Sequence, residues 1–269
     1  MSPEPDYRHL EAFTLDLAAA AGQVALPLFR TGIGTDNKLA HEQRFDPVTE
    51  ADKGAERAIR ALINRHFPEH GIIGEEYGEE NPDAEFVWVL DPVDGTRAFI
   101  SGLPLWTTLI GLRVRGRSRL GVIAQPFLQE VFLGSPLGSR LITPQGDRPL
   151  RVRECSGLSD AVIGTTDPNL FPGDEGVAYN SLLKTVKLAR YGCDAYAFAM
   201  VALGTMDMAL ETGLKPWDIE AIIPVIENAG GVVTDWRGDA VPETAGQVIA
   251  GSSRELVEEA LEHLRPAAL

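Results

Sequence analysis

Apolar residues recur at helical spacing over Tyr7 to Phe29, the first patterned stretch of the chain. Asp6 is a suitable N-cap for a helix there, because its side chain can accept the free N–H groups of the first turn. A polar stretch without a period follows over Thr35 to Pro47. Helical spacing returns over Glu50 to His66, and Thr49 precedes it as a second suitable N-cap. The chain therefore begins with two predicted helices, joined by a polar stretch that fits a mobile loop or a short hairpin.

Beyond the second helix the pattern changes to short apolar runs separated by Gly, Arg and Pro, which is typical of β-strands. These runs lie near residues 86–90, 109–114, 120–124 and 130–133. After a turn-rich connector, GSPLGSRLITPQGDRP, predicted strands near residues 161–164, 206–211, 232 and 248 alternate with predicted helices near residues 175–187, 194–203, 219–228 and 254–264. Such alternation predicts a sheet covered by helices. We expect an α+β subdomain over residues 1–150, with helices on an antiparallel sheet, and an α/β subdomain over residues 151–269.

The composition restricts the partners of the chain. Its 269 residues carry a formal net charge of −15, which repels nucleic acid and anionic membranes, so neither is expected as a partner. A phosphate site on so acidic a protein needs local positive charge, which bound metal ions can supply. Cys155 and Cys193 have no metal-binding spacing and are typical of free thiols in a reducing compartment. With no signal peptide and no apolar run of ~20 residues, we expect a cytoplasmic protein.

The segment WVLDPVDGTRAF, residues 88–99, is the most informative part of the chain. A buried strand runs into Asp91 and Asp94, which are three residues apart, so a tight turn can direct both carboxylates at one point. Two fixed carboxylates suit Mg²⁺, and the backbone carbonyl of Val93 can add another oxygen ligand. Gly95 and Thr96 then begin a predicted helix, and N–H groups at its positive end can bind phosphate. Taken alone, the segment also fits a surface turn in which Asp94 caps a helix.

Three other segments place carboxylates at the end of a strand or the beginning of a helix. In GIIGEEYG, apolar residues lead to Glu75 and Glu76, and in DPVTEADKGAE a helix begins around Asp52. In GLKPWDIEA, Asp218 precedes an apolar helix. Independent caps would explain each segment separately, but four such segments in one chain favour a shared carboxylate site.

The segments GEE, DPVDGT and WD, in this order and at these spacings, resemble the inositol monophosphatase superfamily over about residues 46–231. The resemblance implies a layered αβαβα fold, a requirement for Mg²⁺ and usually a homodimer. It also implies that the substrate is a small phosphate monoester, which a metal-activated water attacks directly. None of the five histidines lies in a motif, which agrees with a mechanism that needs no His-activated nucleophile.

The resemblance further implies roles for individual residues. The implied metal ligands are Glu75, Asp91, Asp94 and Asp218 together with the carbonyl of Val93, and they would hold two or three Mg²⁺ ions, or Mn²⁺ in their place. Asp52 matches the carboxylate that helps to hold the nucleophilic water, and Thr96 is its hydrogen-bonding companion. The catalytic set is then Asp52, Thr96, Glu75 and Asp94. Gly95 and Thr96 match phosphate-binding positions, and Glu76 would support the ligand beside it.

Two segments resemble one branch of this superfamily, the histidinol-phosphate phosphatases of histidine biosynthesis. They are DGTRAFISGLPLW, residues 94–106, and ARYGCDAYAFAMVALGTMDMALETGLKPWD, residues 189–218. Histidinol phosphate carries an ammonium group and an imidazole, so its pocket needs a carboxylate besides the metal ligands. The expected substrate contacts are Arg97, Arg190, Asp194, Glu211 and Asp218, with the arginines on phosphate oxygens in this site or across a dimer contact. Asp194 also fits a plain N-cap, and both arginines fit a solvated surface.

Three hypotheses remain from the sequence. The leading one is hydrolysis of L-histidinol phosphate to L-histidinol and phosphate, and the first alternative is the same chemistry on inositol 1-phosphate or on a broad range of small esters. The second alternative is a non-catalytic metal- or phosphate-binding regulator, against which the complete set of predicted ligands argues. The polar loop over Thr35 to Pro47, which leads to Asp52, is expected to close over the site as a lid.

Overall fold

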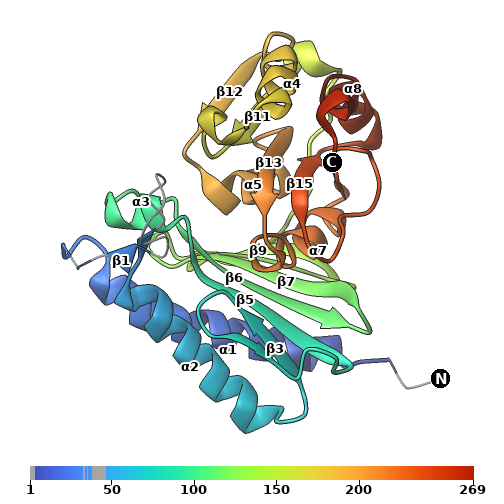
Figure 1. The fold of residues 1–269 in the computed structure, drawn as a ribbon. Helices are drawn as coiled ribbons and strands as arrows, with labels where there is room; N and C mark the ends of the chain where they lie inside the picture. The colour runs from blue at the N-terminus through green and yellow to red at the C-terminus, as the bar shows by residue number, and fades with distance from the viewer. Residues whose placement is uncertain (1–3, 33, 35, 38–46) are drawn as a thin grey trace.

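A computed structural model of the chain describes residues 4–32, 34, 36–37 and 47–269. In this part of the chain, helices and two β-sheets alternate in five layers, helix–sheet–helix–sheet–helix, which confirms the expected αβαβα order (Figure 1). The predicted lid over Thr35 to Pro47 falls mostly outside the described residues. Among the described helices, none combines the length and the apolar character needed to cross a membrane.

Two helices form the first layer. In α1 (Tyr7–Ala25), Asp6 caps the helix by accepting the N–H groups of Arg8 and His9 at 3.1 and 3.2 Å, and the 3-10 helix η1 (Leu26–Leu28) follows. In α2 (Glu50–His66), Thr49 is the N-cap, as predicted, and its N–H donates to the Asp52 carboxylate at 2.8 Å. The apolar faces of both helices are buried against the first sheet. The strands β1 (Asp36–Asn37) and β2 (Pro47–Val48) pair between these helices.

The first sheet has eight strands in the order β10-β9-β8-β7-β6-β5-β3-β4. They are β3 (Gly71–Gly74), β4 (Gly78–Glu80), β5 (Phe86–Asp94), β6 (Thr107–Val114), β7 (Arg117–Gln125), β8 (Glu130–Ser135), β9 (Gly138–Ile142) and β10 (Arg148–Pro149). The prediction of an antiparallel sheet is wrong at one pair, because β5 returns on the far side of β3 from β4 and runs parallel to β3. That parallel pairing places the ends of β3 and β5 side by side.

The middle layer consists of α5 (Asp194–Ala202), α6 (Pro216–Ile219) and α7 (Ile222–Glu227). Glycines at paired positions of β6, β7 and β8 allow α6 and α7 to lie directly on the strand backbones; they are Gly111, Gly121 and Gly134. A Cβ at Gly121 would lie 2.0 Å from the carbonyl oxygen of Ala221, so no other residue fits there without displacing the helices. Apolar residues of this layer and of both facing sheets form one buried cluster.

The second sheet has five strands in the order β12-β11-β13-β15-β14. They are β11 (Val162–Thr165), β12 (Leu188–Tyr191), β13 (Met208–Leu214), β14 (Val232–Thr234) and β15 (Gly246–Gly251). The outer layer, α4 (Asp174–Leu183) and α8 (Arg254–Leu264), covers the far face of this sheet, and α8 has the predicted bounds. The remaining short helices are α3 (Thr96–Ile100), η2 (Leu158–Asp160), η3 (Pro168–Leu170) and η4 (Arg265–Ala267).

Three differences from the sequence prediction have a physical cause that the fold makes plain. The predicted helix over residues 219–228 is interrupted between α6 and α7, since Pro224 has no N–H to donate to the carbonyl of Glu220. The turn-rich connector contains β9, because pairing with β8 and burial of Leu141 outweigh its Gly and Ser content. The strand β12 is not predicted, since its side chains are largely exposed and leave no apolar alternation. The division of the chain into subdomains near Leu150 stays a prediction.

Candidate metal centre and active site

The end of β5 carries two of the predicted carboxylates. The strand pairing shifts between Asp91 and Asp94, so the chain bends there and brings both side chains to the same end of the sheet. The Asp91 carboxylate accepts the N–H of Val93 at 3.0 Å, and the Asp94 carboxylate accepts the N–H of Ala195, at the beginning of α5, at 2.8 Å. Both carboxylates are therefore fixed by backbone donors.

The third carboxylate reaches the same point from the middle layer. Asp218 lies in α6 and accepts the backbone N–H of Lys215 at 2.6 Å, which fixes its side chain at the start of the helix. One carboxylate oxygen each from Asp91, Asp94 and Asp218 all lie within 4.8 Å of one another. Three oxygen ligands at this spacing suit a hard divalent cation such as Mg²⁺.

Glu75 lies beside this cluster at the end of β3. Its backbone N–H donates to the carbonyl of Leu90 at 3.2 Å, which places Glu75 next to Asp91 across the parallel pair of strands. Glu75 is not part of the group of three close carboxylates among the described residues. It is nevertheless near enough for its charge to raise the pKa of Asp91.

The electrostatics of the cluster favour a bound cation. Burial, and after it the charge of Glu75, raise the pKa of Asp91 well above its ordinary value. Burial raises the pKa of Asp94 in the same way, with Asp194 and Asp218 as the next contributors. Ionised carboxylates that repel one another in a buried site are destabilising unless a positive charge neutralises them. The donor set and its repulsion thus both fit a divalent metal ion.

The predicted pair Asp52 and Thr96 meets next to the cluster. Asp52 is almost completely buried, and its carboxylate accepts the N–H and the hydroxyl of Thr49 at 2.8 and 2.5 Å. The Thr96 hydroxyl lies 3.2 Å from the other oxygen of Asp52 and 3.1 Å from the carbonyl of Val93. The start of α2, the end of β5 and the start of α3 are therefore joined at this point.

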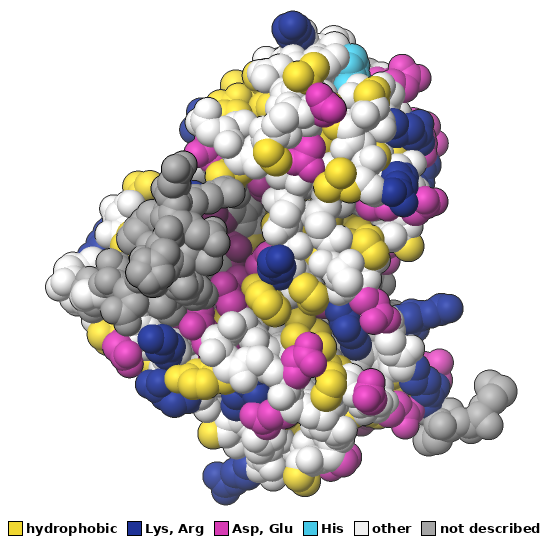
Figure 2. All heavy atoms as spheres, viewed as in Figure 1, with side chains coloured by type: hydrophobic (Ala, Val, Ile, Leu, Met, Phe, Trp, Pro, Cys, Tyr) yellow, Lys and Arg dark blue, Asp and Glu magenta, His cyan; other side chains and the backbone are white. Residues whose placement is uncertain are grey.

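A cavity of about 640 Å³ opens beside the carboxylate cluster. Seven of the predicted site residues line it: Asp94, Gly95, Thr96, Arg97, Asp194, Glu211 and Asp218. In the space-filling view, acidic side chains gather in the hollow between the upper and lower parts of the molecule (Figure 2). Among the described residues that line the cavity, Arg97 is the one cationic side chain, whereas Asp94, Glu175, Asp194, Glu211 and Asp218 are acidic, so the charges of the lining favour cationic groups.

Asp194 lies against the predicted phosphate-binding turn. A Cβ at Gly95 would be 3.1 Å from the Cγ of Asp194, so a larger residue at Gly95 would crowd this carboxylate. Asp194 has a positive φ of 45°, a region that Gly adopts freely and that Asn and Asp adopt more readily than most other residues. Burial raises its pKa to about 6, and the nearby Arg97 partly opposes that shift. Asp194 is thus the first residue of α5, as predicted, and a wall of the cavity.

Glu211, on β13, is another acidic residue that lines the cavity. One oxygen of its carboxylate accepts the hydroxyl of Thr165 at 3.1 Å and the N–H of Thr166 at 2.5 Å. Burial raises its pKa to about 7, although the bonds from Thr166 and Thr165 oppose the shift. Glu211 therefore contributes a carboxylate to the cavity, and its hydrogen bonds within the described part of the chain come from neutral donors.

Some predicted residues lie elsewhere, and some lining residues have no predicted role. Arg190 is exposed on β12 and does not line the cavity, so its role in substrate binding stays a prediction. Glu76 follows Glu75 in the turn after β3, as expected. Glu175 and Thr166 line the cavity without having been predicted, because the residues that surround them come from distant parts of the chain. Glu175 lies in the first turn of α4, where an acidic residue is typical of a helix start, so its place in the sequence indicates no binding role.

A sequence model described as "Inositol monophosphatase family" matches residues 6–268 of this chain. The chain belongs to the inositol monophosphatase family. Among solved structures, an inositol monophosphatase from Zymomonas mobilis is similar with a TM-score of 0.86 and 36% identity, covering 97% of this chain and 100% of that one. Within the inositol monophosphatase family a requirement for Mg²⁺ is typical, in agreement with the cluster of Asp91, Asp94 and Asp218.

Two curated relatives have names that differ in substrate. "Bifunctional phosphatase IMPL2, chloroplastic" from Arabidopsis thaliana is 40% identical over 258 residues, which cover 92% of this chain and 72% of that protein. "Histidinol-phosphatase" from Chlorobaculum parvum is 35% identical over 225 residues, which cover 83% of this chain and 85% of that protein. Both relatives agree with membership of the inositol monophosphatase family, but their names do not agree on one substrate.

Proposed function

We propose that this protein is a Mg²⁺-dependent hydrolase of small phosphate monoesters. The observation that carries the proposal is the group of Asp91, Asp94 and Asp218, whose carboxylate oxygens lie within 4.8 Å of one another beside a cavity of suitable size. A non-catalytic regulator is the weaker hypothesis, because Asp52 and Thr96 lie beside this group in addition to the ligands.

The proposed mechanism assigns a separate task to each part of the site. Glu75, Asp91, Asp94, Asp218 and the carbonyl of Val93 would hold the metal. A bound Mg²⁺ lowers the pKa of a water ligand and neutralises phosphoryl oxygens. Asp52 and Thr96 orient the attacking water, since the Asp52 carboxylate is fixed by Thr49 and accepts a hydrogen bond from the hydroxyl of Thr96. The backbone N–H groups at Gly95 and Thr96 face the phosphate, and Glu76 supports the turn that carries Glu75.

Two esters are candidates for the substrate. The names of the Zymomonas mobilis structure and of the family favour inositol 1-phosphate or a broad range of esters. The walls of the cavity favour an ester with a cationic leaving group, such as L-histidinol phosphate, because Asp194 and Glu211 can bind ammonium or imidazolium. Taken together, the comparisons support the broader activity better than a strict histidinol-phosphate phosphatase. A homodimer, a cytoplasmic location and a phosphate contact by Arg190 remain parts of the proposal.

The test is phosphate release from L-histidinol phosphate and inositol 1-phosphate, measured side by side with Mg²⁺ and with a chelator. We expect release from at least one ester that requires Mg²⁺ and falls by at least about 100-fold in Asp94→Asn, because an amide cannot replace the charge of a metal ligand. Full activity in a folded Asp94→Asn protein would contradict the assignment of the metal site.

The same assay distinguishes the two substrates. Asp194→Asn removes the charge, and Asn tolerates the positive φ at this position, so the backbone is expected to stay in place. We expect KM for L-histidinol phosphate to rise several-fold more than KM for inositol 1-phosphate. An equal change for both esters would mean that Asp194 acts only as the first residue of α5.

A further inference from the structure

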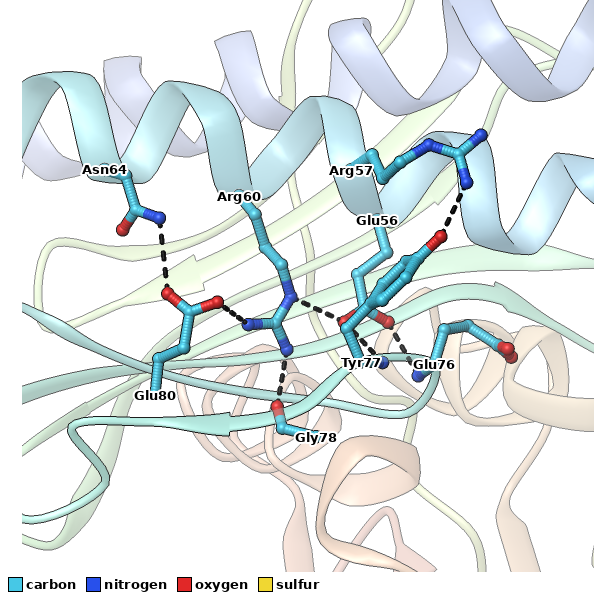
Figure 3. A network of polar contacts seen from close by, with 8 residues as sticks. All are labelled: Glu56, Arg57, Arg60, Asn64, Glu76, Tyr77, Gly78 and Glu80. Carbon is cyan, nitrogen blue, oxygen red and sulfur yellow. Dashed lines mark hydrogen bonds and ion pairs between the residues drawn. The ribbon is translucent and has the colours of Figure 1, made fainter.

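A buried ion pair on α2 contacts the turn that carries Glu75. Glu56 and Arg60 are four residues apart on the helix and are bonded to each other at 2.7 Å, with Glu56 fully buried and Arg60 nearly so. Both side chains point from α2 towards the turn between β3 and β4 (Figure 3). Neither residue lines the cavity, so the pair has no direct contact with a substrate there.

The Glu56 carboxylate binds the backbone immediately after Glu75. One oxygen accepts the N–H of Glu76 at 2.8 Å, and the other accepts the N–H of Tyr77 at 3.2 Å (Figure 3). The N–H of Glu75 itself is bonded to the carbonyl of Leu90 on β5 at 3.2 Å. Consecutive N–H groups of Glu75, Glu76 and Tyr77 are thus all occupied, which fixes the direction in which Glu75 leaves the strand.

Every group that faces the Glu56 carboxylate in these contacts is a donor. The oxygen that accepts from Tyr77 also accepts the Nε–H of Arg60, and the second oxygen accepts from Glu76. A glutamine at this position would place its NH₂ group against one of those donors, whichever way the amide is turned. The site therefore requires a carboxylate and not merely a polar side chain of the same shape.

Gly74 makes this arrangement sterically feasible. A Cβ at Gly74 would lie 2.1 Å from Oε1 of Glu56 and 2.7 Å from a guanidinium nitrogen of Arg60. The ion pair therefore lies directly against the last residue of β3, where any side chain would displace it. Arg60 also donates to the carbonyl of Gly78 at 2.5 Å and to Glu80 at 2.7 Å, so it binds the far side of the same turn.

The helix α2 connects this turn to the predicted water-binding carboxylate. Asp52 and Glu56 are four residues apart and lie on neighbouring turns of α2. A single rigid helix thus holds Asp52 beside Thr96 and holds the turn that follows Glu75. We propose that Glu56 is a positioning residue that sets the direction of Glu75 towards Asp91 and so determines the affinity for the metal, an inference that rests on the proposed metal site.

The test compares Glu56→Gln with wild-type protein by two measurements on metal-free samples. Hydrogen exchange of individual amides reports the turn, and we expect the amides of Glu76 and Tyr77 to be protected in the wild type and to exchange at least 10-fold faster in the variant. Calorimetric titration with Mg²⁺ measures the affinity of the proposed metal site. There we expect the Kd to rise 10- to 100-fold, roughly the range found when groups that support a metal ligand are removed.

Glu80→Gln is the matched control. It removes a carboxylate from the same arginine, Arg60, but Glu80 is half exposed on β4 and does not contact the N–H groups of the turn. We expect both the exchange rates at Glu76 and Tyr77 and the Kd for Mg²⁺ to stay within about twofold of wild type. An equal loss of Mg²⁺ affinity in both variants would overturn the specific role of Glu56.

The two measurements separate failure of this inference from failure of the proposed function. Faster exchange at Glu76 and Tyr77 with an unchanged Kd for Mg²⁺ would overturn the inference and leave the metal site intact. Absence of Mg²⁺ binding by the wild type would overturn the metal site itself, and the inference with it. Should Glu56→Gln not fold, Glu56→Asp, which keeps the charge but is one methylene shorter, is expected to raise the Kd for Mg²⁺ at least threefold; an unchanged Kd would overturn the inference.

Discussion

The acidic residues of the site are held in place mainly by neutral donors. Asp94 is fixed by the N–H of Ala195, Asp52 by Thr49, and Glu211 by Thr165 and Thr166. Hydrogen bonds of this kind orient a carboxylate while leaving most of its charge to act on a ligand. At the scale of single residues, the carboxylates are therefore oriented to bind cations. Their mutual repulsion destabilises the site unless a cation neutralises it.

The burial of Glu211 makes the stability of the folded protein depend on pH. Its pKa in the folded protein is raised from 4.5 to about 7, chiefly by burial, so the folded state binds this proton more tightly than the unfolded chain. Stability from this group is therefore highest at low pH, and it falls as the pH rises from about 4.5 towards 7. Since one pKa unit corresponds to about 1.4 kcal/mol, the loss is on the order of 3 kcal/mol.

Glu211→Gln is expected to remove this loss. The glutamine oxygen can still accept from Thr165 and Thr166, because both bonds go to one oxygen of Glu211. In urea unfolding of metal-free protein, we expect the variant to be more stable than wild type by about 2–3 kcal/mol at pH 8 and close to wild type near pH 4.5. The exposed Glu79→Gln serves as control, and a variant that is less stable than wild type at pH 8 would contradict the argument.

The position of α6 is decided by its contacts with the first sheet. Glycines of β6 and β7 leave room for it, and the Glu220 carboxylate after α6 bonds to the guanidinium of Arg113 on β6, with one contact of 2.6 Å, and to the hydroxyl of Ser118. Both charged side chains are nearly buried. At the scale of elements, this ion pair fixes the short helix that brings Asp218 to the end of β5.

Glu220→Gln is expected to destabilise the protein substantially. The substitution leaves the buried guanidinium of Arg113 without a counter-charge, and the loss of one partner of such a pair costs about 3 kcal/mol or more. Urea unfolding measures this loss directly. The exposed pair of Arg115 and Glu85 is the matched control, and Glu85→Gln should cost no more than about 1 kcal/mol. Similar losses for both variants would mean that burial of the Arg113 pair has no special effect.

The proposed metal ligands come from different layers of the molecule. Asp91 and Asp94 come from the first sheet, whereas Asp218 comes from the middle layer and Asp94 is bonded to the start of α5. A cation that binds all three carboxylates also relieves their mutual repulsion. At the scale of the whole molecule, metal binding should therefore stabilise the packing of the first sheet on the middle layer.

Addition of Mg²⁺ should raise the thermal stability of the protein. A ligand that binds only the folded state adds about 2.7 kcal/mol when its concentration is about 100 times its Kd. We expect calorimetry to show a Tm that rises with Mg²⁺ concentration in the wild type. In Asp218→Asn the dependence should largely disappear, because the amide keeps the bond from Lys215 but lacks the charge. A Tm that responds equally in both proteins would contradict the assignment of Asp218.

The sequence by itself determined the features that depend on neighbouring residues. The N-caps Asp6 and Thr49, the full extent of α2 and α8, and the strand end before Glu75 could all be predicted. These features follow from capping groups, Gly, Pro and local periodicity, which act over a few residues. The three motifs GEE, DPVDGT and WD in their order indicated the family for the same reason.

Only the tertiary structure decided what depends on residues far apart in the chain. Pairing across sheets made β3 and β5 parallel, turned the Gly- and Ser-rich connector into β9 and left Arg190 outside the cavity. Packing of α2 on the β3–β4 turn gave Glu56 its contact with the backbone after Glu75, and the second sheet brought Glu175 to the cavity. The energies of such contacts depend on distances in space, which local sequence patterns do not encode.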